Sequence, residues 1–300
     1  MKLIAPSYYK NFKCIADKCK HSCCIGWEID VDAKTDAFYK TVGGELGRRL
    51  NESIDRSTDT PHFKLSDGER CPFLNKNGLC DIITELGDGA LCQICADHPR
   101  DRNFYSDRTE IGLGLCCEAA AALVLGSTEK TTLITVSDDG EEEDADIEDE
   151  LFFNMREKIF AIVQDRSKTI SDRIRALLYE FDLAMPNKTV AEWSDDFLAL
   201  EMLDSEWGTM LGKLKSLKSE PQYEKDCECE QLLVYFIYRH LADGLYDGRI
   251  NERIKFAVIG LNMIVSIAAA TGSSIVEVAR AYSSEIEYSE ENIDKLLNML

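Results

Sequence analysis

Hydrophobic positions in the second half of the chain recur with the spacing of α-helices. The first such run contains Leu151, Met155, Ile159 and Ile162, which fall on one helical face. A later run opens with Ser274 and Glu277, the spacing of a capping box. No alternation of strands and helices follows. The pattern predicts an α-helical bundle with helices at about 151–164, 174–181, 191–203, 204–218, 227–243, 250–271, 274–285 and 289–300.

The first 125 residues have a different pattern, with short turns in place of long apolar runs. Asn77-Gly78 is a turn signal between two cysteines, and 118–125 is an alanine-rich helix. The segment from Ser137 to Glu150 carries ten Asp and Glu residues and few apolar ones, which is typical of a solvated linker or insertion. We therefore predict a mainly α protein: a loop-rich, metal-stapled cysteine domain at 1–125, an acidic linker at 126–150 and a helical domain at 151–300.

Twelve cysteines change this picture, because ten of them precede residue 118. A chain of this length without a secretory signal favours metal binding over a disulfide framework. Short spacings let a turn present two thiolates to one metal, and thiolates suit zinc and iron–sulfur centres alike. His21 and His98 are expected to be polar neighbours rather than ligands. The early cysteines form four groups: Cys14, Cys19, Cys23 and Cys24; Cys71 and Cys80; Cys92 and Cys95; Cys116 and Cys117.

Composition and charge limit the classes of partner that we expect this protein to bind. The 300 residues are 45% apolar and carry a formal net charge of −21, which disfavours nucleic acid and anionic membrane surfaces as partners and accommodates a basic protein. Met1–Lys10 does not have the pattern of a signal peptide. The apolar stretch Phe256–Ala270 is shorter than the roughly 18–20 residues that cross a bilayer, so it is expected to be a buried helix. A cytoplasmic location is the expectation.

Familiar cofactor motifs are absent from the sequence. There is no phosphate-binding loop, no dinucleotide fingerprint and no nucleophile elbow. Cys19 and Cys23 are followed directly by Cys24, so the C-x₃-C-x₂-C spacing of most radical S-adenosylmethionine enzymes is missing too. Gly112 and Gly114 lie beside cysteines and are expected to serve a turn or close packing. The residues themselves therefore indicate a metalloprotein with a helical companion domain.

Several segments resemble the flagellin lysine-N-methylase family. They are Phe12–Trp27, Cys71-Pro72-Phe73-Leu74, Leu79–Ile82, Cys95–Arg100, Leu113–Glu118 and the helix Gln231–His240 with Asp247-Gly248 after it. The cysteine motifs also occur in a broader class of zinc- or iron-chelating cysteine-cluster proteins. The resemblance implies methyl transfer from S-adenosylmethionine to lysine ε-amines of flagellin or another lysine-bearing protein. It also implies an iron–sulfur centre, a 4Fe–4S cluster in the first instance, with zinc as the alternative. Family ligands fall on Cys14, Cys19, Cys23, Cys24, Cys71, Cys80, Cys95 and Cys116.

Alternatives stay open at this point. The cluster either binds the methionine end of the cosubstrate or is structural, with direct attack by a neutral lysine. A non-enzymatic protein that stores or senses iron or zinc, and a structural zinc fold, compete with the enzyme; the long helical half favours the enzyme. The roles of Cys92 and Cys117 are not assigned, nor is an oligomeric state. Cys227 and Cys229 are expected to be surface or packing residues, and the acids and tyrosines that could line a lysine site are Glu28, Asp97, Glu118, Tyr235 and Tyr238.

Overall fold

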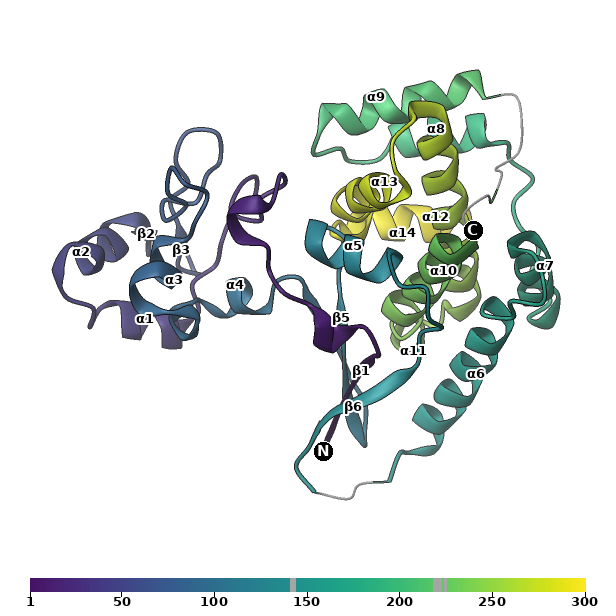
Figure 1. Cartoon of the computed structure of the whole chain (residues 1–300), viewed down its shortest axis with the longest axis horizontal. Helices are drawn as coiled ribbons and strands as arrows, with labels where there is room; N and C mark the ends of the chain where they lie inside the picture. The colour runs from purple at the N-terminus through teal and green to yellow at the C-terminus, as the bar shows by residue number, and fades with distance from the viewer. Residues whose placement is uncertain (141–143, 218–222, 224–225) are drawn as a thin grey trace. The chain divides into compact units, whose positions relative to one another are not determined.

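The computed structural model describes residues 1–140, 144–217, 223 and 226–300. The chain forms two compact units. Met1–Phe12 and Asp101–Leu300 make the larger one, which we call the helical unit, and Lys13–Arg100 make the smaller one, which we call the cysteine unit (Figure 1). The cysteine unit is thus inserted between two parts of the helical unit.

This division differs from the predicted one, in which residues 1–125 form one domain. The beginning and the end of that segment both contribute strands to a sheet of the helical unit. The four strands lie in the order β4-β5-β1-β6. β1 pairs in parallel with β5, with Leu3 opposite Thr109, and antiparallel with β6, with Ala5 opposite Ile134. The strands are β1 (Lys2–Pro6), β4 (Arg100–Phe104), β5 (Arg108–Leu113) and β6 (Leu133–Asp138).

The segment expected to be an acidic linker is partly built into the helical unit. Its first part contains β6, which ends at Asp138, and its last part begins helix α6 at Ile147. Asp149 is buried and accepts hydrogen bonds from the backbone N–H and the hydroxyl of Ser106, 2.7 Å and 2.6 Å long. Glu141–Glu143 lie outside the described residues.

The remainder of the helical unit is α-helical, as the periodicity predicts. The capping box at Ser274 and Glu277 is present, and Thr189 with Glu192 forms a second one. The helix expected to run to residue 218 ends at Lys213 and continues as a 3₁₀ turn. The helices are α5 (Glu118–Leu125), α6 (Ile147–Val163), α7 (Ile170–Glu180), α8 (Val190–Leu198), α9 (Ser205–Lys213), α10 (Asp226–His240), α11 (Gly244–Asp247), α12 (Ile250–Thr271), α13 (Ile275–Tyr282) and α14 (Glu290–Met299).

Helices α10 and α12 form the centre of this unit. They pack closely because Gly260 has no side chain: a Cβ there would lie 2.8 Å from the ring of Phe236. The rings of Phe236, Phe256 and Tyr282 meet edge to face or tilted beside them. In the described part of the chain, α12 is the helix with the length and composition to cross a membrane, and 72% of its apolar window is buried inside the protein. The expectation of a buried helix here is confirmed.

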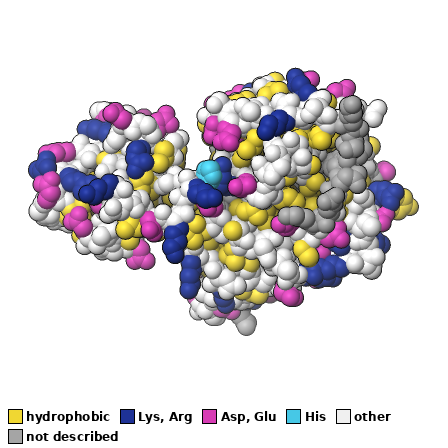
Figure 2. Space-filling model, turned by 45° about the horizontal axis from the view of Figure 1, so that its top comes forward, with side chains coloured by type: hydrophobic (Ala, Val, Ile, Leu, Met, Phe, Trp, Pro, Cys, Tyr) yellow, Lys and Arg dark blue, Asp and Glu magenta, His cyan; other side chains and the backbone are white. Residues whose placement is uncertain are grey.

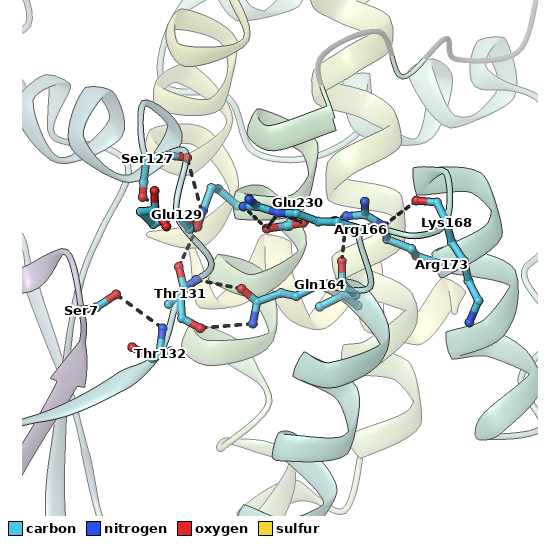
Figure 3. A network of polar contacts seen from close by, with 12 residues as sticks. Ser7, Ser127, Glu129, Thr131, Thr132, Gln164, Arg166, Lys168, Arg173 and Glu230 are labelled. Atoms are coloured by element: carbon cyan, nitrogen blue, oxygen red, sulfur yellow. Dashed lines mark hydrogen bonds and ion pairs between the residues drawn. The ribbon is translucent and has the colours of Figure 1, made fainter.

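A polar network fixes the start of α10 against its neighbours (Figure 3). The buried carboxylate of Glu230 accepts from Arg166 at 2.8 Å and from Arg173 at 2.7 Å. Beside it, Gln164 bonds both the N–H and the carbonyl of Thr131, and the Thr131 hydroxyl donates to Gln231 at 2.7 Å. These contacts join the segment before β6 to α6, α7 and α10, so they position the sheet against the bundle.

The cysteine unit is short of regular structure, as predicted. Its small apolar core contains Tyr39, Phe63 and Phe73, and the Tyr39 hydroxyl donates to the carbonyl of Ala90 at 2.8 Å. Glycines with positive φ, such as Gly78 at 75°, make its turns. Its elements are α1 (Ala33–Tyr39), α2 (Gly44–Ser53), β2 (Ile54–Asp55), β3 (His62–Phe63), α3 (Asp81–Leu86) and α4 (Gln93–Asp97), besides short 3₁₀ turns.

The charged side chains are mixed on the face that Figure 2 shows. Lys and Arg residues are interspersed there with Asp and Glu instead of being separated from them. Among the described residues, several acids are paired with bases, wherever they lie: Asp36 with Arg56 and Lys40, for example, and Glu45 with Arg48. The net charge of −21 is therefore not gathered into one acidic patch on this face.

Candidate functional site

Five cysteines meet at the core of the cysteine unit. Cys71 and Cys92 are buried in it, and Cys24, Cys80 and Cys95 pack against it. We call these five residues the thiol cluster. They come from three separate stretches of sequence, so the fold of the unit, and not sequence spacing alone, brings them together.

Backbone contacts explain this convergence. The N–H of Cys71 donates to the carbonyl of Cys24 at 2.8 Å, which holds two distant loops side by side. A tight turn with Gly78 at its tip then returns the chain, so that Cys80 lies opposite Leu74. Cys92 precedes the first turn of α4 and Cys95 lies within it. A short helix thus presents these two thiols on one side.

The thiols of the cluster influence one another. Burial above all, with a contribution from charge on Cys24, Cys80 and Cys92, raises the pKa of Cys71 to about 12. A hydrogen bond with Cys23 lowers the pKa of Cys24 to about 7. The contact between Cys92 and Cys95 lowers the pKa of the first and raises that of the second. Thiols this close repel as thiolates unless a cation joins them.

The other predicted ligands lie elsewhere. Cys14 and Cys23 are exposed on the cysteine unit, and Cys19 is half-buried there. The thiol of Cys19 donates to the carbonyl of His21 at 3.2 Å. Cys116 belongs to the helical unit. Thus four predicted ligands, Cys24, Cys71, Cys80 and Cys95, come together, and Cys92 joins them although its role was left open.

The thiol cluster has the ligand type that a metal centre needs, but its thiols are not spaced to hold a metal ion. Five thiols suit zinc or an iron–sulfur cluster rather than magnesium or calcium. In the described part of the chain, however, no three Cys, His, Asp or Glu side chains converge closely enough to hold a metal ion. The thiol cluster is therefore a candidate ligand set, and the metal-stapled domain stays a prediction.

The remaining cysteines have packing or surface positions. Cys117 is half-buried against the core of the helical unit, at the start of α5. Cys229 is fully buried in that core, and Cys227 is exposed. The expectation of surface and packing roles for Cys227 and Cys229 is confirmed.

A second group of polar side chains lies inside the helical unit, around Glu287. Glu287 ends a π-helical turn, Ser283–Glu287, a kind of distortion that is frequent at functional sites. Three of its companions come from the end of α10, one from β4 and one from the loop after β5. We call the group the Glu287 cluster: Asp101, Cys116, Tyr235, Arg239, His240, Ser283, Glu287 and Tyr288.

The Glu287 carboxylate is completely enclosed. Its Oε2 accepts from the hydroxyls of Tyr235 at 2.5 Å and Ser283 at 2.6 Å, and its side chain is 0% exposed. Burial raises the pKa of Glu287, but the neighbouring His240 and Arg239 and the hydrogen bond from Ser283 lower it by more. The net direction is downward, so Glu287 is ionised at neutral pH.

Arg239 joins this carboxylate to the surface. Its guanidinium donates to Asp101 at 2.8 Å, lies 3.7 Å from Glu287 and stands 5.1 Å from the ring centroid of Tyr288. The side chains of Arg239 and Asp101 are 12% and 22% exposed, and Tyr288 is 49% exposed. Burial raises the pKa of the nearby Cys116 thiol to about 11. The cluster therefore opens to solvent at Asp101 and Tyr288.

Three buried atoms of the cluster lack hydrogen-bond partners among the described residues: Oε1 of Glu287, Nε of Arg239 and Nε2 of His240. The first and the last are 3.3 Å apart without being aligned for a good hydrogen bond. Buried polar atoms are rarely left in this state. The cluster thus has capacity for a further polar group.

The sequence analysis found only part of this cluster. Tyr235 was a candidate lysine-site residue, and it contacts Glu287; Cys116 was a candidate metal ligand. Tyr238 instead donates to the carbonyl of Ile111 at 3.2 Å, inside the fold. Acids at 285 and 287 after an apolar helix were the available signal for Glu287. Of the other candidates, Glu28 is exposed near His62, Asp97 accepts from Gln93 at 2.6 Å, and Glu118 is in the first turn of α5.

Gly112 serves the close packing expected of it. A Cβ at this position would lie 2.8 Å from the Asp101 carboxylate and 3.1 Å from the ring of Tyr238. We expect Gly112→Ala to displace Asp101 from Arg239 and to lower the free energy of unfolding by about 1–3 kcal/mol in urea titrations. Gly212→Ala is the control: nothing lies within 4 Å of its added Cβ in α9, so stability should stay equal or rise. Equal stability of both variants would contradict this packing role.

The helical unit also has a small surface cavity. Its lining includes Met185, Trp193 and Met263, with the Lys188 ammonium 4.7 Å from the centroid of the Trp193 ring. Among the residues that the structure describes, neither a thiol nor a carboxylate lines it. We therefore place the candidate chemistry at the thiol cluster and the Glu287 cluster.

Comparisons with known proteins support the resemblance drawn from the cysteine motifs. The flagellar biosynthetic protein FliU of Salmonella muenchen is 26% identical over 137 residues, 43% of this chain and 79% of that protein. The lysine-N-methylases of Salmonella choleraesuis and Salmonella typhimurium are each 26% identical over 134 residues, again 43% of this chain but only 33% of their own length. No family model and no solved structure matches. The resemblance to lysine-N-methylases is thereby confirmed as a similarity over part of the chain.

Proposed function

We propose that this protein is a protein-lysine N-methyltransferase that uses S-adenosylmethionine and an iron–sulfur centre, with flagellin as its first candidate substrate. The observation that carries the proposal is the similarity to two proteins named lysine-N-methylase. The flagellar name of a further relative supports the choice of substrate. Five thiols gathered in one small unit support the metal centre.

Within this proposal the thiol cluster holds the metal. Cys24, Cys71, Cys80, Cys92 and Cys95 provide more thiols than the four that a 4Fe–4S cluster takes. A metal centre bound there would hold together the three separate stretches of chain that carry these cysteines. Cys71 and Cys92 are buried and the other three thiols are half-buried, which limits access of water and oxidants to them.

Methyl transfer itself needs a neutral amine. The lysine nitrogen forms a bond to the methyl carbon as the carbon–sulfur bond breaks, which leaves S-adenosylhomocysteine and a methylated ammonium that loses one proton. Desolvation lowers the pKa of a lysine, and a neighbouring carboxylate can receive the proton.

The competing function is binding of iron or zinc without catalysis. The location of the thiol cluster is consistent with metal binding alone, because all five thiols belong to one compact unit. A metal-binding protein alone, however, leaves the buried acids and the arginine of the Glu287 cluster without a role.

The test is methyl transfer by anaerobically purified, iron-analysed protein. Purified flagellin and S-adenosylmethionine with a labelled methyl group are incubated with it, and modified lysines are located by mass spectrometry. We expect label on surface lysines, and none when the lysines have been acetylated beforehand. A parallel reaction with an unrelated lysine-rich protein separates flagellin from lysine-bearing proteins in general. Iron-loaded protein that labels neither protein would refute the enzymatic proposal and favour metal binding.

A further inference from the structure

The Asp101–Arg239 pair is the part of the Glu287 cluster that a ligand can reach. Both side chains are half-buried, and the exposed ring of Tyr288 stands beside the guanidinium. One N–H of Arg239 donates to Asp101, and its Nε lies 3.7 Å from Glu287 without a hydrogen bond among the described residues. An acid and a base side by side at a surface opening match a ligand that carries both charges.

The interior of the cluster adds a second carboxylate. Glu287 lies 3.7 Å from Arg239, and its Oε1 is buried without a hydrogen bond. Asp101 and Glu287 thus share one guanidinium, with His240 as the nearest further base. A ligand with a surplus positive charge would offset the second carboxylate, since buried charges are stable only when paired.

We propose that the Glu287 cluster binds the amino-acid end of S-adenosylmethionine. Arg239 takes the α-carboxylate and Asp101 takes the α-ammonium, while Glu287 offsets the positive sulfonium. This inference rests on the proposed function, which names the cosubstrate, and assigns it to residues of the helical unit. Charged hydrogen bonds of this kind are the strong ones, and a guanidinium is shaped to hold a carboxylate by two of them.

Other ligands fit the cluster less well. A phosphate would meet two carboxylates beside one guanidinium. A lysine side chain of the substrate carries a positive charge alone and would leave Arg239 without an anion in exchange. The amino-acid zwitterion satisfies both members of the surface pair at once, and the sulfonium supplies the extra charge that Glu287 needs.

The experiment compares two ligands that differ only at this end. S-adenosylhomocysteine has the amino-acid group, and 5′-methylthioadenosine keeps the adenosine and the thioether without it. We expect the iron-loaded full chain to bind the first more tightly by about tenfold to a hundredfold in isothermal titrations, because charged hydrogen bonds are lost with the second. Arg239→Lys, which keeps the charge but loses the fork, and Asp101→Asn should remove most of this difference and leave binding of 5′-methylthioadenosine unchanged.

Arg249→Gln is the matched control. Arg249 pairs with Asp294 at 2.8 Å in the same unit, so this variant loses an ion pair of equal length outside the cluster and should keep the preference. Folded fractions come from thermal melts and from binding of 5′-methylthioadenosine.

The outcomes separate the two proposals. Wild-type protein that binds neither ligand would contradict S-adenosylmethionine dependence, and with it the proposed function. Wild-type protein that prefers S-adenosylhomocysteine, with the preference intact in folded Arg239→Lys and Asp101→Asn, would overturn this inference alone. If the preference for S-adenosylhomocysteine survives both substitutions but disappears from wild-type protein when the metal is removed, the amino-acid end binds at the metal. That result would also overturn this inference.

Discussion

Serine at Cys95 or at Cys92 is expected to abolish the iron and acid-labile sulfide of the anaerobically purified protein, and its brown colour with them. The two thiols share one side of α4 and contact each other. Hydroxyls are poor ligands for iron–sulfur clusters, and either substitution removes one of the two thiols that the same short helix presents. Metal and sulfide analysis with a visible absorption spectrum measures the effect.

The location of each cysteine determines how strongly its replacement by serine should lower the metal content. Cys92→Ser should be as damaging as Cys95→Ser, because both belong to the thiol cluster. Cys14→Ser should have a smaller effect, since Cys14 is exposed outside it, and Cys227→Ser in the helical unit should have none. Full iron in Cys95→Ser, or zinc alone in the wild-type protein, would be incompatible with an iron–sulfur centre at these thiols.

Glu110→Gln is expected to lower the free energy of unfolding by about 3–5 kcal/mol, because it leaves Arg156 charged and buried without its partner. The two side chains form a double hydrogen bond of 2.5 Å and 2.6 Å, with exposures of 0% and 3%. The guanidinium is enclosed by the rings of Phe152 and Tyr238, 5.2 Å and 5.5 Å from their centroids. Urea denaturation at neutral pH measures the loss.

Two further variants sharpen this result. Removing both charges, in Glu110→Leu with Arg156→Met, should recover most of the lost stability, since no charge is then buried alone. Glu291→Gln breaks an exposed pair with Lys295 in the same unit and should cost less than about 1 kcal/mol. If Glu110→Gln proved no worse than Glu291→Gln, the buried pair would contribute little to the fold.

The helices of the second half were predictable because their signals are local. Apolar periodicity and a cap such as Ser274 lie within a few residues of the helix they specify. The sheet was not predicted, because β1 pairs with strands more than a hundred residues later, and nothing local in its five residues marks their partners. The division into a helical unit and an inserted cysteine unit depends on the pairing of β1 with β5 and β6, so it was not predicted either.

The candidate site was predictable to the same extent. The residue types indicated thiol ligation, but only the fold separates Cys92, inside the thiol cluster, from Cys14 outside it. Nothing in the sequence around Asp101 or Glu287 marks them as site residues. They become candidates because Arg239 pairs with both in the folded chain. Such contacts between distant segments depend on tertiary packing rather than on any motif.

The insertion of the cysteine unit between β1 and β4 imposes an order on synthesis. β1 leaves the ribosome before the cysteine unit, and its partners β5 and β6 follow only after all of Lys13–Arg100 has been made. The first strand must therefore wait unpaired while the complete cysteine unit emerges. That unit has its own core, so it can collapse, and bind the metal that we propose for it, before the helical unit closes its sheet.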